Sequence, residues 1–407
     1  MRTRFLALFL ALASVTFFTT SCSSDDNSTG VVDQASVLTL NLKGKEIKDY
    51  TKLDLEIFET NTGETIKEIL VSSSHTLKLP KGSYKISVNG LATLTTGEEM
   101  QVGATATIDI INPEHQLTIN LVVKSFSEDF IIEEIFFTGV RTNEGKLYTS
   151  GRYFKLTNNT DKVLKTGGLM ILQSEFLNTV NHNVTPDIKS EAFSVKGVLM
   201  IPNEHSKDVE PGDFLVIADM AMDHKKSNIP AYDLSKADYE YPNLDNPNLG
   251  QVDNPLVPNA VVIFSTMNYN MFFLMDRASE SFALARFPEG VTIDQWIQNH
   301  SYNYEYLNQA GNITSKTAMK VPNNWIIDGV NSSSTAKWLH NTLDNSIDSG
   351  WTGVGEIDSD PSRYGKSIRR KVVGTMENGK NLYKDTNNST ADFTRDSEPS
   401  LKNGISH

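Results

Sequence analysis

The chain has 407 residues and a formal net charge of −13; 39% of its residues are hydrophobic and 9% aromatic. This apolar fraction suits folded domains and argues against a disordered chain. The acidic balance argues against nucleic acid or an anionic lipid surface as a partner, because both carry negative charge. The negative charge is compatible with cationic ligands and divalent metal ions as partners.

The first residues have the pattern of a secretory signal. Arg2 and Arg4 precede an apolar run from Phe5 to Phe18, and small polar residues follow. The run is too short to cross a hydrocarbon layer of roughly 30 Å as a mature helix. The sequence therefore predicts a signal peptide over residues 1–21; the alternatives are a short amphipathic start or a membrane anchor.

Cys22 is the single cysteine of the chain and lies where such a signal is cut. Cleavage before a lipid-modified cysteine explains both its position and its solitude, and a lone thiol excludes an internal disulfide. Thr19 stands where the usual lipobox has Leu. This relaxed motif resembles the lipoboxes of Bacteroidota, so we expect lipidation at Cys22 and anchoring in the outer membrane.

Residues 22–34 read as a lipidated, flexible tether. Its Ser23-Ser24-Asp25-Asp26-Asn27 stretch resembles the acidic signal with which Bacteroidota lipoproteins reach the cell surface; the alternative is any polar tether. Removal of residues 1–21 takes away two arginines and no acids. The mature chain then has 35 basic and 50 acidic residues, a charge of −15.

Residues 35–125 alternate apolar and polar side chains in short segments: 37–42, 53–58, 84–88, 105–110 and 117–123. This period of two, with turns at residues 61–63 and 80–82, predicts a β-sandwich. Residues 79–90 resemble an element of prealbumin-like and carboxypeptidase-regulatory-like sandwiches, in which a proline-glycine turn leads into a strand with an inward tyrosine, here Tyr84. The resemblance implies an immunoglobulin-like spacer domain.

Polar residues at 124–129 indicate a junction, and a second β region covers residues 126–400. Its expected strands are 130–139, 153–160, 168–172, 214–218, 260–264, 283–287, 324–328 and 366–372. The intervening segments 174–209, 222–259 and 300–322 are long enough to be functional or to have structure of their own. Short helices are expected after Thr292 and from Ser334 to Leu343.

The second region resembles lamin-tail-like domains. The resemblance is carried by Glu133-Glu134-Ile135, residues 153–159, residues 209–218, and residues 365–370 with 385–393. It implies a larger immunoglobulin-like β-sandwich with long loops and a few short helices, so the whole protein is expected to be all-β. Lys155 stands where the signature usually has Glu, which puts a binding role of that position in doubt.

Residues 223–225, 233–240 and 252–255 resemble a Bacteroidota outer-membrane lipoprotein family known only as a domain of unknown function. The resemblance spans roughly residues 35–400. It implies a cell-surface address and, since members of that family often lie beside TonB-dependent receptors, a role in uptake. It implies no reaction.

The acidic segment between Asp219 and Val257 is the first candidate for ligand contact. It interleaves carboxylates and one imidazole with tyrosines, a mixture common at recognition surfaces: Asp223, His224, Tyr232, Tyr239 and Tyr241. The alternative is that the segment packs over the edge of the sandwich. Trp351, in a glycine-rich stretch, either stacks on a sugar or peptide or fills the core.

A calcium site is a second candidate. Asp385, Asn387, Ser389 and Asp396 fall at positions one, three, five and twelve of a calcium-type loop. Position six is Thr390 rather than Gly, and position twelve is Asp rather than Glu. The alternative is an Asx-rich turn whose side chains bind backbone amides. No other cofactor is expected.

Catalytic motifs are weak. Ser334 and Lys337 match a serine–x–x–lysine spacing, but the motifs that accompany it are missing, as are His-Glu-x-x-His, phosphate loops and Gly-x-Ser-x-Gly. The leading prediction is a non-catalytic surface lipoprotein that binds a ligand or an outer-membrane receptor, such as a TonB-dependent one, as an uptake accessory. A surface adhesin or structural lipoprotein is second, and a carboxylate-based hydrolase third.

Overall fold

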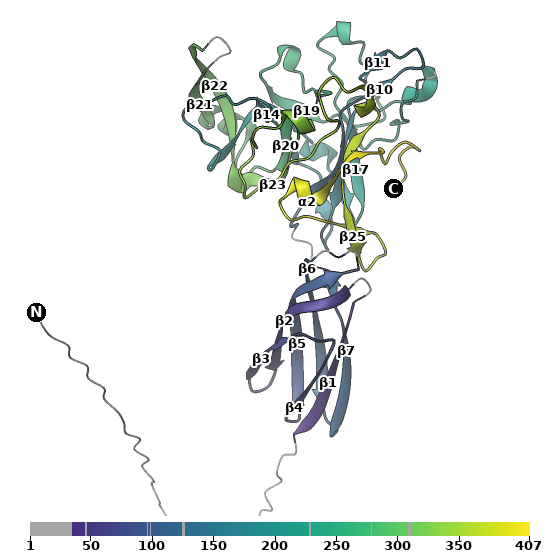
Figure 1. Cartoon of the computed structure of the whole chain (residues 1–407), viewed down its shortest axis with the longest axis vertical. Coiled ribbons are helices and arrows are strands. Elements are labelled where there is room, and N and C mark those ends of the chain that lie inside the picture. The colour runs from purple at the N-terminus through teal and green to yellow at the C-terminus, as the bar shows by residue number, and fades with distance from the viewer. Residues whose placement is uncertain are drawn as a thin grey trace, which may run out of the picture.

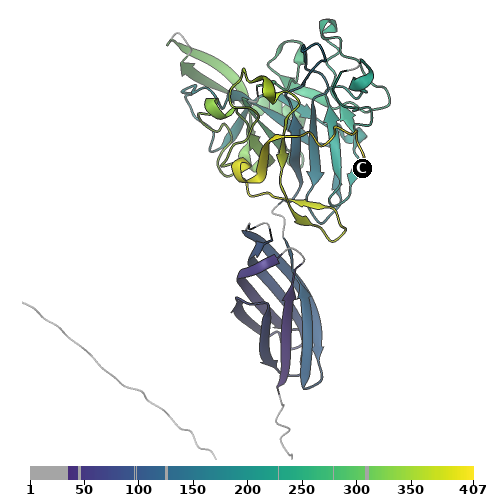
Figure 2. The same ribbon diagram turned by 45° about the vertical axis from the view of Figure 1, so that its right-hand side comes forward.

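The computed structural model describes residues 35–44, 47–95, 97, 99–123, 127–227, 229–277, 279–307 and 311–407. The predictions for the signal peptide, Cys22, the tether and residues 124–126 of the junction lie outside these residues. The described residues form a slender body of strands up to residue 123 and a larger one from residue 127, seen one above the other in both views (Figures 1 and 2). The predicted all-β sandwich fold is confirmed.

The N-terminal domain is a sandwich of two sheets, with strand orders β4-β1-β7 and β3-β2-β5-β6-β8. Its strands are β1 (Ser36–Lys43), β2 (Ile47–Glu59), β3 (Thr65–Leu70), β4 (Ser74–Leu79), β5 (Gly82–Leu94), β6 (Glu99–Ile110), β7 (Glu114–Asn120) and β8 (Val122–Val123). Alternate residues of β1 and β2 are buried and face each other across the core, as the period of two requires.

Tyr84 points inward, as expected for the turn-and-strand element. Its ring is buried, and its hydroxyl donates to the carbonyl oxygen of Pro80 at 3.0 Å. Strands β3 and β4 were not predicted. β3 is an edge strand of which only Leu70 is buried, so its sequence shows little of the hydrophobic alternation that identifies a strand.

The larger domain is a second sandwich. One sheet has the order β18 (Tyr239–Glu240), β17 (Phe214–Ala218), β12 (Tyr153–Asn158), β9 (Phe130–Phe136), β24 (Ser367–Arg370) and β27 (Phe393–Ser397). The other has the order β21 (Ser301–Leu307), β22 (Ile313–Pro322), β15 (Ala192–Met200), β14 (Met170–Leu177), β20 (Glu280–Ala285) and β23 (Ile326–Asn331), with β19 (Val261–Ser265) paired to β15. A buried cluster joins them; Phe154 of the first sheet meets Phe282 of the second at 5.4 Å between ring centroids.

Three short strand pairs decorate this sandwich: β10 (Val140–Arg141) with β11 (Leu147–Tyr148), β13 (Leu164–Lys165) with β16 (Asp208–Val209), and β25 (Val372–Thr375) with β26 (Asn381–Tyr383). The last pair reaches the N-terminal domain. There Val373 and Leu382 form a small buried cluster with Leu94 and Met100. Beside it a groove of about 770 Å³ runs between the domains.

Two α-helices occur among the described residues, α1 (Ile293–Asn299) and α2 (Ser389–Asp392). α1 confirms the helix expected after Thr292. The Gln295 amide donates to the Thr292 hydroxyl, and the Thr292 amide donates to the Gln295 side chain, which closes a capping box. Among the described residues, no helix has both the length and the apolar character to cross a bilayer.

The helix expected from Ser334 to Leu343 is wrong, since only a short 3₁₀ turn, η6 (Thr335–Lys337), forms there. The backbone amides of this segment bond elsewhere: Ala336 donates to Glu356, and Leu339 donates to Asn178. Residues 300–322, flagged as a long connection, have structure of their own, namely the β21–β22 hairpin.

Candidate functional site

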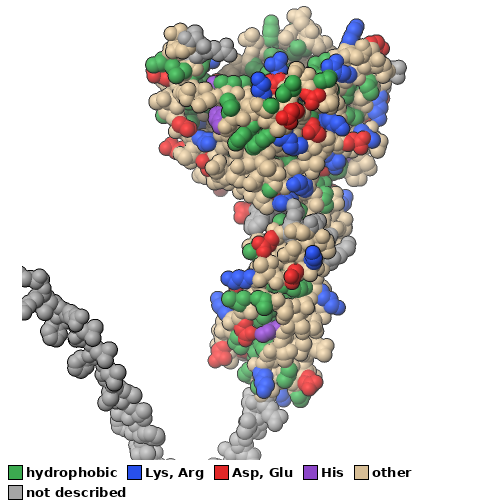
Figure 3. Space-filling model, viewed as in Figure 1, with side chains coloured by type: hydrophobic (Ala, Val, Ile, Leu, Met, Phe, Trp, Pro, Cys, Tyr) green, Lys and Arg blue, Asp and Glu red, His purple; other side chains and the backbone are tan. Residues whose placement is uncertain are grey.

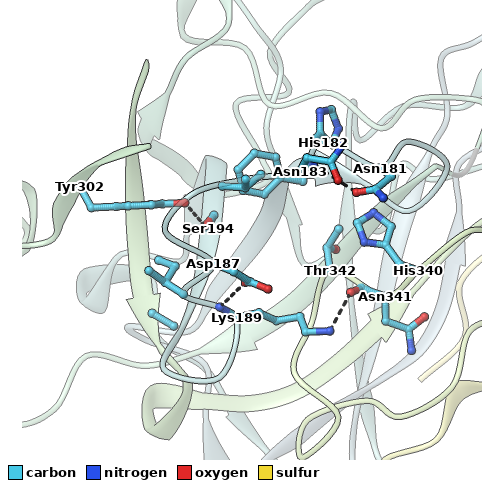
Figure 4. Close-up of a pocket in the computed structure, with 14 residues that line it drawn as sticks. Asn181, His182, Asn183, Asp187, Lys189, Ser194, Tyr302, His340, Asn341 and Thr342 are labelled. Carbon is cyan, nitrogen blue, oxygen red and sulfur yellow. Dashed lines mark hydrogen bonds between the residues drawn. The ribbon is translucent and has the colours of Figure 1, made fainter. Parts of the chain in front are cut away.

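A cleft of about 280 Å³ opens at the β21 edge of the larger domain (Figure 4). One wall is formed by residues 176–194, which lead from the end of β14 to the start of β15. The other wall is formed by residues 340–342. Polar side chains dominate the part that Figure 4 labels: Asn181, His182, Asn183, Asp187, Lys189, Ser194, Tyr302, His340, Asn341 and Thr342. The volume is near the lower end of the roughly 300–1,000 Å³ typical of small-molecule sites.

The first wall follows from how the chain covers an exposed sheet edge. After β14 the chain runs along β21, where Thr185 and Glu305 exchange two backbone hydrogen bonds of 2.8 Å. It then turns into β15, which pairs with β22. An uncovered edge strand would present unpaired amides and carbonyls, so this segment both protects the edge and forms one side of the cleft.

The second wall is fixed by a buried amide. The Asn178 side chain donates to the Ser281 hydroxyl and to the Ser332 carbonyl, each at 2.9 Å, and accepts from the Thr342 amide at 3.0 Å. The Thr342 hydroxyl in turn bonds to Ser281 at 2.6 Å. A satisfied buried network of this kind rigidifies the segment that carries His340 and Asn341.

Two histidines, His182 and His340, line the cleft and lie on the same side of it in the view of Figure 4. His340 Nε2 lies 3.0 Å from the carbonyl oxygens of both Leu177 and Val180, so this nitrogen carries the proton. His182 Nε2 is buried and has no hydrogen-bond partner among the described residues. Burial lowers the pKa of His182, and the positive charges of His340 and Lys316 lower it further. The His182 ring is therefore neutral at pH 7.

A row of tyrosines supports the cleft from β21. Tyr302, Tyr304 and Tyr306 share one face of the strand, with 5.8 and 5.9 Å between successive ring centroids. Phe176 packs edge-on against Tyr304 at 5.2 Å and also contacts the His182 ring at 5.3 Å. The aromatic packing holds His182 in place, so its free nitrogen keeps a fixed direction.

The predicted tyrosines and the histidine of the acidic loop are interior. Tyr232, Tyr239 and Tyr241 are 8%, 0% and 7% exposed, and His224 is buried between the Tyr148 hydroxyl (2.7 Å) and the Met220 carbonyl (3.1 Å). Asp223 accepts from the amide two residues later, as in an Asx turn. This placement favours the alternative that the loop is part of the fold; a binding role for these residues stays a prediction.

The four predicted calcium ligands have separate partners. Asp385 pairs with Arg370 at 3.1 Å, the Asn387 side chain donates to a carbonyl, and Ser389 donates to Asp348 at 2.6 Å. Asp396 accepts from the Gly355 amide at 2.7 Å. The part of the chain that the structure describes contains no group of three or more acidic, histidine or cysteine side chains suited to a metal ion. Calcium binding stays a prediction.

Trp351 is half-exposed and stacks on Trp338, with ring centroids 5.4 Å apart and planes 9° from parallel. The serine–x–x–lysine pair does not form a unit, because Ser334 donates to Asp358 at 2.9 Å while Lys337 is exposed. Sequence reasoning missed His182, Tyr302 and His340 as well as Trp338. The alternation of tyrosines in residues 302–306 and the length of the 174–209 segment were the available signals.

Part of the chain is similar to a protein family of unknown function. Residues 210–400 match the sequence profile described as "Protein of unknown function (DUF4876)". This confirms for those residues the predicted resemblance to such a family. The crystal structure of a DUF4876 family protein from Bacteroides thetaiotaomicron is similar, with a TM-score of 0.61 and 20% identity, covering 90% of this chain and 96% of that one. At this identity the likeness establishes the fold alone.

Two further crystal structures match weakly. Proteins of Bacteroides thetaiotaomicron and Bacteroides ovatus, both provisionally described as adhesins, have TM-scores of 0.21 and 0.18 and identities of 8% and 10%. They cover 73% and 76% of this chain, and 99% and 89% of their own. Scores this low support no argument about this chain. A search of curated proteins gave no match.

Proposed function

We propose that the protein is a lipid-anchored, non-catalytic binding protein of the cell surface, which captures a polar ligand for an uptake system of the outer membrane. The observation that carries the proposal is the cleft of the larger domain, above all the buried His182 nitrogen, to which the described residues offer no hydrogen-bond partner. A buried, unsatisfied acceptor or donor is unfavourable, and a ligand group that bonds to it removes that penalty.

The chemistry of the cleft suits binding. Amide, imidazole, ammonium and carboxylate groups from two walls converge on one space, and they offer both donors and acceptors. Lys189 Nζ contacts the Asn341 carbonyl at 3.4 Å and adds a positive charge to the wall of the cleft, although this charge also acts on Asp344. The rigid backing of both walls limits the entropy lost when a ligand binds.

The N-terminal domain suits the role of a spacer. β1 begins at the end of this domain away from the larger domain (Figures 1 and 2), and Val123 of β8 packs on the buried cluster shared with the larger domain. β5 has 13 residues, and at roughly 3.3 Å per residue it spans about 40 Å. A chain anchored before residue 35 would therefore hold the cleft well away from the membrane surface.

The test is ligand capture by the full acylated protein, purified in detergent. We expect equilibrium dialysis against culture-medium extract, followed by mass spectrometry, to show a compound enriched by the wild type. His182→Ala should weaken this capture about tenfold, the effect of losing one buried hydrogen bond to a polar group. His205→Ala is the matched control, because the His205 side chain is exposed and does not line the cleft. Equal capture by both variants would overturn the assignment of the cleft.

One observation favours the second candidate, a surface adhesin. Four large apolar residues between Tyr241 and Val257 are exposed: Leu244 (56%), Leu249 (41%), Val252 (54%) and Leu256 (90%). Exposed apolar residues gathered in one loop are typical of protein contact sites. If adhesion is the function, Leu244→Ser with Leu256→Ser abolishes cell attachment while His182→Ala leaves it unchanged.

A further inference from the structure

The Trp338–Trp351 pair belongs to a stack of three planar groups. The Arg395 guanidinium carbon lies 4.5 Å from the centre of the Trp351 ring, and Trp351 in turn lies almost parallel to Trp338. Trp351 therefore lies against one face of the Trp338 ring. Trp338 is nevertheless 38% exposed, so this residue offers surface to a ligand.

Hydrogen bonds fix the Trp338 indole and the backbone that carries Trp351. Trp338 Nε1 donates to Asn341 Oδ1 at 3.0 Å, and the Asn341 amide donates to the Gly350 carbonyl at 2.9 Å. The Trp351 backbone exchanges two hydrogen bonds with the Thr390 hydroxyl. A ring held this way loses little freedom when a ligand stacks on it.

The stack and the cleft are parts of one surface. Asn341, which fixes the Trp338 indole, also lines the cleft, and His340 lies beside it on the same segment (Figure 4). A ligand resting on Trp338 would therefore lie beside the segment that carries His340 and Asn341 into the cleft. We infer that this surface binds a carbohydrate, with one sugar ring on Trp338 and its neighbour in the cleft.

The inference rests on the proposed binding function and gives it a ligand class. A pyranose ring has a face of C–H groups, which packs on an aromatic ring, and an edge of hydroxyls, each both donor and acceptor. The exposed indole matches the face. The amides of Asn181 and Asn183, with the unpartnered His182 nitrogen, match the edge. A nucleic-acid base would also stack, but the net charge of −13 disfavours its phosphates.

The experiment is affinity electrophoresis of the full acylated protein in detergent, in gels containing starch, dextran, xyloglucan or polygalacturonate. We expect at least one neutral polysaccharide to retard the wild type. Trp338→Ala should weaken binding about tenfold, the loss of a stacking surface worth about 1.4 kcal/mol. Trp338→Tyr should keep most of the affinity. Leu339→Ala, which removes the exposed apolar neighbour but not the stack, is the matched control and should bind as the wild type does.

The outcomes separate the two proposals. If no polysaccharide binds but the dialysis experiment still enriches a compound through His182, the carbohydrate class is wrong and the binding function survives. If a proline-rich peptide added as a competitor binds in place of the polysaccharides, the carbohydrate class is also wrong. Binding of Trp338→Ala at wild-type strength overturns the role of the stack. Circular dichroism of each variant excludes misfolding as the cause of a loss, and Trp338→Tyr decides if Trp338→Ala misfolds.

Discussion

Buried charged residues explain several motifs that pointed toward function in the sequence. Arg370 is buried and donates to both oxygens of Asp328, at 2.7 and 2.9 Å, as well as to Asp385 at 3.1 Å. Asp392 lies 3.7 Å from the same guanidinium. Removing one partner of such a cluster leaves uncompensated buried charge, so these residues are constrained by the fold. Asp385 is therefore already paired where the calcium hypothesis needs a free ligand.

Lys155, which stands where the lamin-tail-like signature usually has Glu, is likewise part of a buried charge pair. Its ammonium pairs with Glu133 at 2.7 Å, and both side chains are buried. It also lies 4.0 Å from the centre of the Phe214 ring. A Glu at this position would place two carboxylates side by side in the interior. The lysine thus forms a structural pair with Glu133 of the neighbouring strand β9, which sequence reasoning had no means to place beside it.

Glu134 gives a prediction about pH. Burial raises its pKa, and hydrogen bonds from Ser400 with the charge of Arg369 only partly offset this. A carboxyl whose pKa is raised by folding binds its proton more tightly in the folded state. Its contribution to stability is therefore present near pH 4.3, the ordinary pKa of Glu, and declines as the pH rises toward the raised value.

Glu134→Gln removes this titration while keeping an oxygen that accepts from Tyr153 and Ser400. We expect the wild type to lose stability from about pH 4.3 upward more steeply than the variant. Urea unfolding followed by tryptophan fluorescence measures this. All four tryptophans, 296, 325, 338 and 351, lie in the larger domain, so the signal reports the domain that contains Glu134. Parallel pH profiles would contradict the prediction.

At the scale of elements, helix α1 depends on a single buried side chain. Trp296 has 0% exposure, donates from Nε1 to the Lys320 carbonyl at 3.0 Å, and packs edge-on against Phe264. Ile297, the next residue of the helix, is 41% exposed. The helix is therefore held to the sandwich by one residue.

Trp296→Ala should lower the free energy of unfolding of the larger domain by roughly 3–5 kcal/mol, the usual effect of emptying a large aromatic site. Ile297→Ala, its matched control, should change it by less than about 0.5 kcal/mol. Urea unfolding followed by the fluorescence of the other three tryptophans gives both values. A small loss in Trp296→Ala would show that the surrounding residues collapse into the space and that α1 does not rely on this anchor.

Hydrophobic patterns in the sequence predicted strands of this protein but not its cleft. Strands such as β1 and β2 have one buried face, so their period of two identifies them. In β9 and β12 every residue is buried, so no alternation marks these strands. They were predicted from their apolar and β-branched residues instead. The cleft lay beyond this reasoning, because it is built by contacts between residues far apart in the sequence, such as Asn178 with His340 and Thr185 with Glu305.

At the scale of the whole molecule, charge is dispersed. Acidic and basic side chains are interspersed on the face seen in Figure 3, and no single-sign patch dominates it. A net charge of −13 with this distribution supports solubility and gives no attraction to anionic membranes. Membrane attachment is then expected to depend on the lipid predicted at Cys22.

The last prediction tests that anchor. Cys22→Ala removes the thiol that we propose to be acylated, so the protein should lose lipid labelling and move from the membrane to the soluble fraction. The reason is that the lipid supplies the hydrophobic attachment, while the acidic surface would be repelled by anionic lipids. Asp25→Ala with Asp26→Ala is the matched control: it should keep the lipid and the membrane, and lower exposure to protease on intact cells. Fractionation after a salt wash measures attachment, and retention of the Cys22→Ala protein on membranes would mean that another part of the chain binds them.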